Sequence, residues 1–90
     1  MPATFDPDKD AINLQKHGIS LAEADGVLND PLALTVEDQS AEGEPRFATI
    51  GMNAFGTLMV VVWTPRGEEI RVISARRTEP KERRTYEEGI

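Results

Sequence analysis

The apolar and polar positions along the chain predict helices first, then a sheet, and then a last helix. The first helix begins at Asp6-Pro7, because the aspartate can cap free backbone N–H groups and proline suits the first helical position. We expect it to run to about His17, with Gly18 as its left-handed stop. The sequence Ser20–Glu23 has the form of a capping box and predicts a second helix to about Leu28.

Both predicted helices have apolar positions that we expect to gather on one side. In the first helix these positions are Ala11, Ile12 and Leu14. In the second helix and the residues leading into it they are Ile19, Leu21, Ala24, Val27 and Leu28.

Four β-rich stretches follow, at residues 32–36, 46–51, 57–64 and 69–76. The third stretch is the most apolar, and short turns between the last three favour antiparallel pairing. A closing helix over residues 81–88 is predicted after Thr78-Glu79-Pro80, with Thr78 as its cap. The sequence therefore predicts a single α+β domain over residues 1–90: two N-terminal helices, a three- to four-stranded, mainly antiparallel sheet and a C-terminal helix.

Composition excludes several classes of site. The chain has 90 residues, no cysteine and one histidine, which argues against disulfides and against thiolate or histidine zinc sites. The aspartates and glutamates show no recognisable metal-ligand spacing, so we expect no metal or other cofactor. No stretch approaches the roughly 20 apolar residues of a membrane span, and no secretory signal is visible. We therefore expect a cytoplasmic protein that makes no membrane contact.

Charge is unevenly distributed along the chain. The net charge is −6, but residues 1–45 hold two lysines against ten acidic residues, and residues 46–90 hold eight basic residues against six acidic ones. The local charges are therefore −8 and +2. Because binding to phosphate depends on the local field, the acidic total does not exclude a nucleic-acid ligand. The acidic half also suits a basic protein partner.

The C-terminal third carries the most informative chemistry. Arg71–Arg77 alternates charge with apolar bulk, and Lys81–Tyr86 follows as a basic helix that ends in tyrosine. Arginine is costly to hold near a core, and its planar guanidinium fits phosphate. Arginines fixed on a strand therefore indicate a site for a phosphate-bearing ligand.

Several short motifs occur in a fixed order along the chain, and the most specific are Lys16-His17-Gly18-Ile19-Ser20 and Ile73-Ser74-Ala75-Arg76. The others, in order, are Phe5-Asp6-Pro7-x-Lys9, Asn13, Glu23-Ala24, Asp30-Pro31, Arg46-Phe47-x-x-Ile50-Gly51, Val60 to Thr64, Arg66-Gly67, Ile70-Arg71 and Glu82-Arg83-x-x-Tyr86. Together these motifs, which extend over nearly the whole chain, resemble the BrnT family of bacterial toxins.

The resemblance implies a RelE-like ribonuclease fold and a toxin that cleaves RNA and blocks translation. It also implies a cognate BrnA-like antitoxin, a small ribbon-helix-helix protein that neutralises the toxin and carries the complex to operator DNA. Assembly with the antitoxin as a dimer or heterotetramer would follow.

Metal-free RNA cleavage requires a base for the 2′-OH, cations for the charged phosphorane and an acid for the leaving 5′-oxygen. RelE-like enzymes use lysine, arginine and tyrosine for these tasks. The residues we expect to be catalytic are Lys16, His17, Arg46, Arg76 and Tyr86. Those we expect to bind substrate are Lys9, Arg71, Arg77 and Arg83. RNA phosphate would dock on Arg46 and Arg76, and either Lys16 or His17 would transfer a proton, leaving a 2′,3′-cyclic phosphate.

Structural interpretations compete with these roles. Lys16 and His17 also suit the negative end of the first helix dipole. Arg71 and Arg76 are five positions apart, so strict alternation puts them on opposite faces of the sheet unless a bulge intervenes. Either arginine can pair with a neighbouring glutamate such as Glu82, and Tyr86 can be a packing residue.

Two positions depart from the family pattern. Asp38-Gln39-Ser40 lacks a histidine that members often carry there, and Glu44-Pro45-Arg46 has proline where a second glutamate is usual. Proline removes a backbone donor at the start of the strand. The alternative function is therefore a catalytically inactive module that acts only by binding its antitoxin in a DNA-bound repressor complex.

Overall fold

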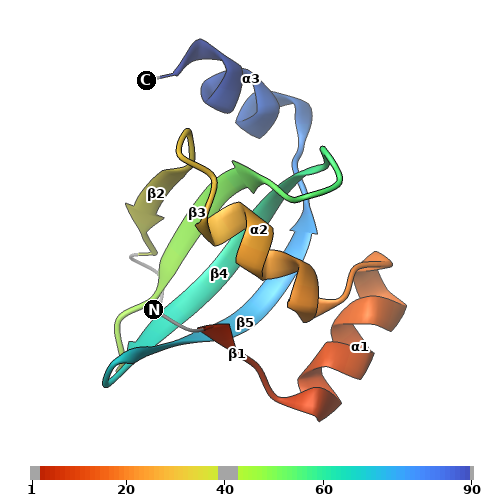
Figure 1. Ribbon diagram of the computed structural model, residues 1–90, viewed down its shortest axis with the longest axis vertical. Coiled ribbons are helices and arrows are strands. Elements are labelled where there is room, and N and C mark those ends of the chain that lie inside the picture. Colours follow the sequence, from red (N-terminus) through yellow and green to blue (C-terminus); the bar gives the residue numbers. More distant parts are fainter. Residues whose placement is uncertain (1–2, 39–42, 90) are drawn as a thin grey trace.

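A computed structural model describes residues 3–38 and 43–89 and shows a five-stranded sheet flanked by helices (Figure 1). The strands are β1 (Ala3–Thr4), β2 (Leu34–Glu37), β3 (Phe47–Met52), β4 (Leu58–Arg66) and β5 (Glu69–Arg77). Their order in the sheet is β1-β5-β4-β3-β2, with β1 parallel to β5 and every other pair antiparallel. The α+β class is confirmed, but the predicted count of three to four strands is wrong because β1 was missed.

The first two helical segments begin at the capping residues predicted from the sequence. Helix α1 (Pro7–His17) is capped by Asp6, whose carboxylate accepts a hydrogen bond from the Asp8 N–H, and it ends at Gly18 with φ of 70°. The Ser20 capping box is present, although it opens a short 3₁₀ turn, η1 (Leu21–Glu23), which leads into α2 (Ala24–Leu28). These findings confirm the two predicted N-terminal helices.

The closing helix α3 (Pro80–Glu88) is capped by Glu79 and not by the predicted Thr78. Glu79 accepts from the third backbone N–H of the helix, while its own N–H donates to Glu82 at 2.8 Å. Thr78 instead donates its N–H to the Leu58 carbonyl and continues the β4–β5 pairing. None of the described helices is long and apolar enough to cross a membrane.

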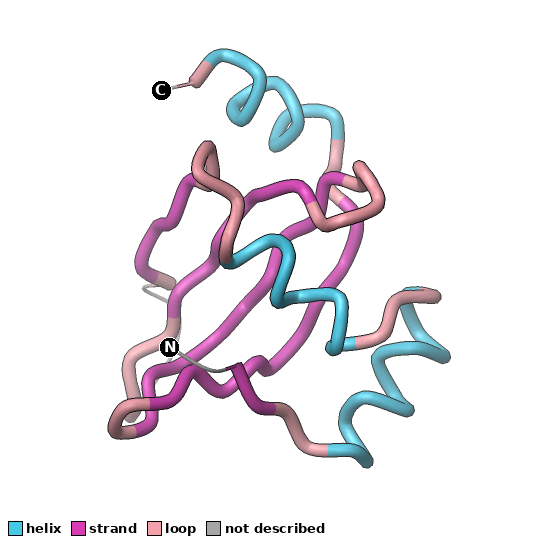
Figure 2. Tube along the Cα trace, viewed as in Figure 1, coloured by secondary structure: helices cyan, strands magenta, loops and turns pink. Residues whose placement is uncertain are grey.

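Helix α2 covers one face of the sheet, α1 lies beside β5 at the edge of the sheet, and α3 lies at one end (Figures 1 and 2). The core contains apolar residues of the second helix region, which were predicted from the sequence, and the strand residues that they face. Its buried members are Ile19, Leu21, Ala24 and Val27 with Met59, Val61, Val72 and Ala75.

The apolar positions of α1 do not join the core. Ile12 and Leu14 are 62% and 51% exposed, and the buried residue of α1 is Asn13. The Asn13 amide donates to the carbonyls of Ile19 and Ala75, both at 2.8 Å, and accepts from the Ala75 N–H at 3.2 Å. Helix α1 is thus fastened to the edge of β5, beyond the end of β1, by hydrogen bonds of a polar side chain.

A β-bulge decides which side chains share a face of β5. Val60 pairs with Arg76 and Thr64 pairs with Arg71, with a register shift between Val62 and Trp63. Because Val60 and Thr64 are an even number of positions apart on β4, their partners lie on the same face. The prediction from strict alternation, that Arg71 and Arg76 point to opposite faces, is therefore wrong.

We call the face of the sheet opposite α2 the second face (Figure 1). It is mainly apolar across β2, β3 and β4 and becomes basic on β5. Its cross-strand rows contain Leu34, Val36, Ala48, Ile50, Val60 and Val62, followed on β5 by Arg71, Ser74 and Arg76.

Candidate functional site

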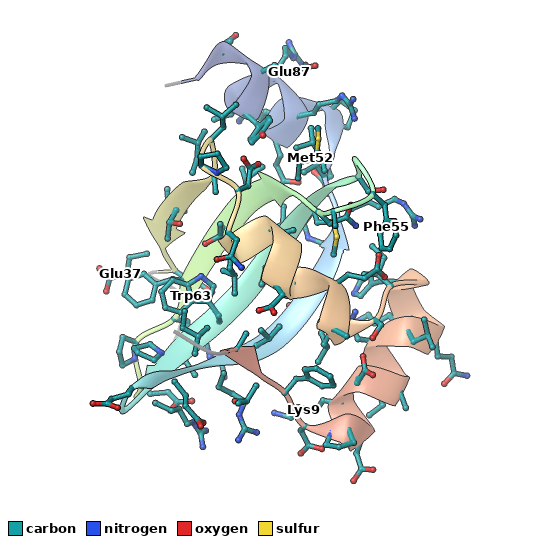
Figure 3. All side chains as sticks on the ribbon, in the orientation of Figure 1. Lys9, Glu37, Met52, Phe55, Trp63 and Glu87 are labelled. Atoms are coloured by element: carbon teal, nitrogen blue, oxygen red, sulfur yellow. The ribbon has the colours of Figure 1, made fainter. Side chains whose placement is uncertain are left out.

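Basic side chains of α1 meet the bulged part of β5. Lys9, Lys16 and His17 lie on the turns of α1 next to Asn13, which fixes that side of the helix against β5. Together with Ile12, Ile73 and Ser74 they line a cavity of about 180 Å³. Figure 3 shows Lys9 near the N-terminal end of α1, on the side that faces the sheet.

A second cavity, of about 240 Å³, adjoins the first and shares Lys9 and Ile73 with it. Three arginines converge there, from the start of β3, the end of β4 and the start of β5: Arg46, Arg66 and Arg71. We call the residues Lys9, Lys16, His17, Arg46, Arg66 and Arg71 the basic cleft.

Carboxylates neutralise little of this charge. Of the two acids that line the cleft, Glu44 lies 3.7 Å from Arg66 in a half-exposed ion pair, and such pairs are weak. Asp6 is engaged as the cap of α1. Within the described residues neither Arg46 nor Arg71 forms an ion pair, and the Nε atom of each is buried without a hydrogen-bond partner. Two guanidinium groups are therefore available to an anionic ligand.

Backbone contacts hold Arg46 at the cleft. The hydroxyl of Thr64, which is fully buried, donates to the Pro45 carbonyl at 2.6 Å, and the Asp38 N–H donates to the Arg46 carbonyl at 2.8 Å. Pro45 has no backbone N–H to donate, but its carbonyl is held by the hydrogen bond from Thr64. Arg46 is therefore held at the cleft although Pro45 departs from the family pattern. Gln39 and Ser40, the other departure, lie outside the described residues.

Arg76 of β5 is paired with a residue of α3. Its guanidinium donates two hydrogen bonds to the Glu82 carboxylate of α3, at 2.8 and 2.7 Å, and a further one to the Arg77 carbonyl at 3.2 Å. These bonds raise the pKa of Arg76, and the same bonds lower the pKa of Glu82 below its ordinary value. The sequence-based alternative that an arginine pairs with Glu82 is confirmed for Arg76.

Tyr86 is also engaged. Its hydroxyl donates to Asp30 at 2.6 Å, and Asp30 also accepts the backbone N–H groups of Met52 and Leu32. The Tyr86 bond lowers the pKa of Asp30, and the carboxylate raises the pKa of Tyr86 above its ordinary value. A phenol held in this way is a weaker acid, and with the Arg76 pair it fastens α3 to the rest of the fold.

The other predicted ligands lie outside the basic cleft. Arg83 forms an exposed i,i+4 pair with Glu87 at 3.7 Å, and Arg77 is exposed at the end of β5. The structure thus brings together Lys9, Lys16, His17, Arg46 and Arg71, and separates Arg76, Arg77, Arg83 and Tyr86 from them.

Sequence reasoning gave no role to three residues that build this region. Ser74 lines the cavity beside Lys16 and His17, Asn13 orients α1, and Asp30 anchors α3. The signal for Asn13 was an asparagine inside a helix, where its propensity is poor and a tertiary hydrogen bond is the usual compensation. In the described ranges no three His, Asp or Glu side chains gather as metal ligands would.

Comparisons with known proteins identify the family of the chain and support its fold. The family model described as "Ribonuclease toxin, BrnT, of type II toxin-antitoxin system" matches residues 5–82. The crystal structure of the Brucella abortus ribonuclease toxin BrnT superposes with a TM-score of 0.64 at 23% identity, covering 88% of this chain and 99% of that one. No curated protein matches the chain. Since the family model covers most of the sequence, the chain belongs to the BrnT family of ribonuclease toxins of type II toxin–antitoxin systems.

Proposed function

We propose that the basic cleft is the site at which this toxin binds and cleaves RNA. The observation that carries the proposal is the convergence of Lys9, Arg46 and Arg71 on one cavity of an otherwise acidic protein. Neither arginine is neutralised by a carboxylate among the described residues. Guanidinium groups free of ion pairs bind phosphate by paired, charge-assisted hydrogen bonds.

The cleavage step we propose uses only side chains of the chain itself. The 2′-OH of the substrate loses its proton to Lys16 or His17 and attacks the adjacent phosphorus. Arg46, Arg71 and Lys9 stabilise the negative charge that develops on the phosphorane oxygens. The bond to the 5′-oxygen then breaks, that oxygen receives a proton from the protonated Lys16 or His17, and the products are a 2′,3′-cyclic phosphate and a 5′-OH.

Arg76 and Tyr86 enter this proposal as residues that position α3. Arg76 shares its sheet face with Arg71 and Ser74, so it borders the cleft, but contact with RNA would require it to leave Glu82. Its predicted role in phosphate binding, and the predicted catalytic role of Tyr86, remain predictions. Arg77 and Arg83, being exposed, would at most extend the phosphate-binding surface.

The cellular role proposed here follows the family. RNA cleavage would inhibit translation in the cytoplasm, and a BrnA-like antitoxin with a ribbon-helix-helix domain would neutralise the toxin. That antitoxin would bind operator DNA, and the toxin would reach DNA only as part of a dimeric or heterotetrameric complex.

Induced expression in a bacterial host tests the proposal, with growth and RNA integrity followed together. Wild-type protein should arrest growth and degrade RNA, and Arg46→Ala and Arg71→Ala should relieve both effects by about 100-fold, the scale of one lost transition-state donor. Arg83→Ala is the matched control, since it removes an exposed arginine outside the cleft, and it should remain toxic. Arg76→Ala, run beside them, tests the prediction that Arg76 contacts the substrate.

Two results would overturn the assignment. Full toxicity of folded Arg71→Ala and Arg46→Ala would place the site elsewhere. Normal growth and intact RNA with folded wild-type protein would favour the inactive, antitoxin-binding module considered from the sequence.

A further inference from the structure

An apolar groove lies on the second face of the sheet, between β2 and α3. Five apolar side chains from three strands line its floor, and Glu82 and Thr85 of α3 form one wall. The volume is about 360 Å³, and the apolar lining is Leu34, Val36, Ala48, Ile50 and Val60. Val36 is 65% exposed although it belongs to a strand, so the apolar surface is open to a partner.

Helix α3 leaves this groove unfilled. None of its described residues is buried, and polar contacts fasten it: the Arg76–Glu82 pair and the Tyr86–Asp30 hydrogen bond. A helix that buries no side chain gains little from packing, so these polar contacts hold α3 beside the groove while the apolar floor of the groove stays uncovered.

The edge of the groove is positively charged. Lys81, Arg84 and Glu88 line an adjoining cavity that shares Thr85 with the groove. In the described part of the chain Lys81 and Arg84 have no ion-pair partner. The neighbouring carboxylates Glu87 and Glu82 form ion pairs with Arg83 and Arg76. An apolar floor beside two unpaired cations is complementary to a segment that is apolar on one side and acidic on the other.

We propose that this groove receives an amphipathic, acidic segment of the antitoxin. Its apolar side chains would lie on Leu34, Val36 and Ile50, and its carboxylates would face Lys81 and Arg84. The inference rests on the antitoxin partner named in the proposed function, but not on the cleavage chemistry.

Such binding would also account for neutralisation. The groove and the basic cleft open on the same face, because Arg71 and Ser74 share the face of Val60 and Val36. An antitoxin segment seated in the groove therefore lies on the face of the sheet that carries Arg71. The acidic residues of that segment would also repel RNA phosphates from the cleft.

The test measures the affinity of purified full-length toxin for its cognate antitoxin, without RNA. Val36→Glu places a charge on the groove floor at an exposed position, and Phe55→Glu is the matched control: Phe55 is 84% exposed in the β3–β4 turn, on the other side of the molecule from β2 (Figure 3). Val36→Glu should weaken binding by about tenfold or more, the equivalent of one buried valine. Phe55→Glu should stay within about twofold of the wild type.

A charge reversal adds a second, independent readout. Lys81→Glu should weaken the complex and make its affinity less sensitive to salt, because one attractive pair becomes repulsive. In cells, Val36→Glu should stay toxic and escape rescue by the antitoxin. Since the affinity measurement needs no RNA cleavage, its outcome is separate from that of the Arg71→Ala experiment.

Unchanged antitoxin affinity in folded Val36→Glu would refute the proposal. So would a Val36→Glu effect confined to self-association of the toxin, seen by sedimentation, because a second copy of this chain would then be the occupant of the groove.

Discussion

Replacing Asn13 by alanine tests how α1 is held in place. The Asn13 amide makes three hydrogen bonds, one with Ile19 and two with Ala75, and the side chain is 5% exposed. At about 1 kcal/mol for each bond, Asn13→Ala should cost about 3 kcal/mol, and more if the Ala75 groups stay buried without water. For a domain of this size each kcal/mol shifts the Tm by about 4–8 °C, so the Tm should fall by roughly 12 °C or more.

Asn29→Ala provides a matched control. The Asn29 amide makes one exposed hydrogen bond, to the Asp25 carbonyl, so its removal should cost no more than about 0.5 kcal/mol. Asn13→Asp should be at least as harmful as alanine, because a carboxylate would face the carbonyls of Ile19 and Ala75 without a proton to donate.

Denaturant unfolding followed by the fluorescence of Trp63, the single tryptophan, measures all three variants. Equal and small losses for Asn13→Ala and Asn29→Ala would refute the reasoning. Such a result would mean that α1 is held by contacts other than the Asn13 amide, and that the positions of Lys9 and Lys16 do not depend on it.

Three further predictions concern α3, the contact between α2 and the sheet, and the cleft. Because Asp30 raises the pKa of Tyr86, the single tyrosine should form phenolate above its ordinary pH range, and Asp30→Asn should lower the midpoint of that titration. The Tyr86–Asp30 hydrogen bond stabilises the fold at pH values below the ordinary pKa of tyrosine, and this stability is lost as the pH rises through the raised pKa of Tyr86. An unchanged phenolate absorbance curve would contradict this. Gly26→Ala would put a Cβ 2.7 Å from the backbone nitrogen of Ala54 and should destabilise the fold by about 1–3 kcal/mol in denaturant unfolding; no loss would show that the two segments part freely. RNA affinity should fall with rising salt, and Arg71→Ala should lower the slope of log Kd against log salt by about one unit, whereas an unchanged slope would mean no phosphate contact there.

Local signals in the sequence were sufficient to place the helices, although the cap of α3 is Glu79 and not Thr78. Asp6 and Gly18 bound α1 because a cap and a left-handed stop act within a few residues. β1 was missed for the opposite reason: two residues carry no alternation, and their pairing with Ile70 and Arg71 is more than 60 positions away in the chain. Contacts of that range leave no local pattern.

The sequence could not predict how the candidate residues are grouped in space. The bulge near Ile73 shifts the alternation of β5 and reverses the expected relation of Arg71 to Arg76. Glu82 of α3 then pairs with Arg76, whereas Arg71 forms no ion pair within the described residues. Periodicity within one strand cannot show either effect, since both depend on a neighbouring element.

The most direct test of the central claim is cleavage of a defined RNA by purified protein in the presence of a metal chelator. The wild type and Arg83→Ala should produce fragments that end in 2′,3′-cyclic phosphate, and folded Arg71→Ala should be slower by about 100-fold. Equal cleavage by Arg71→Ala and Arg83→Ala, or cleavage that stops when metal is removed, would contradict the account.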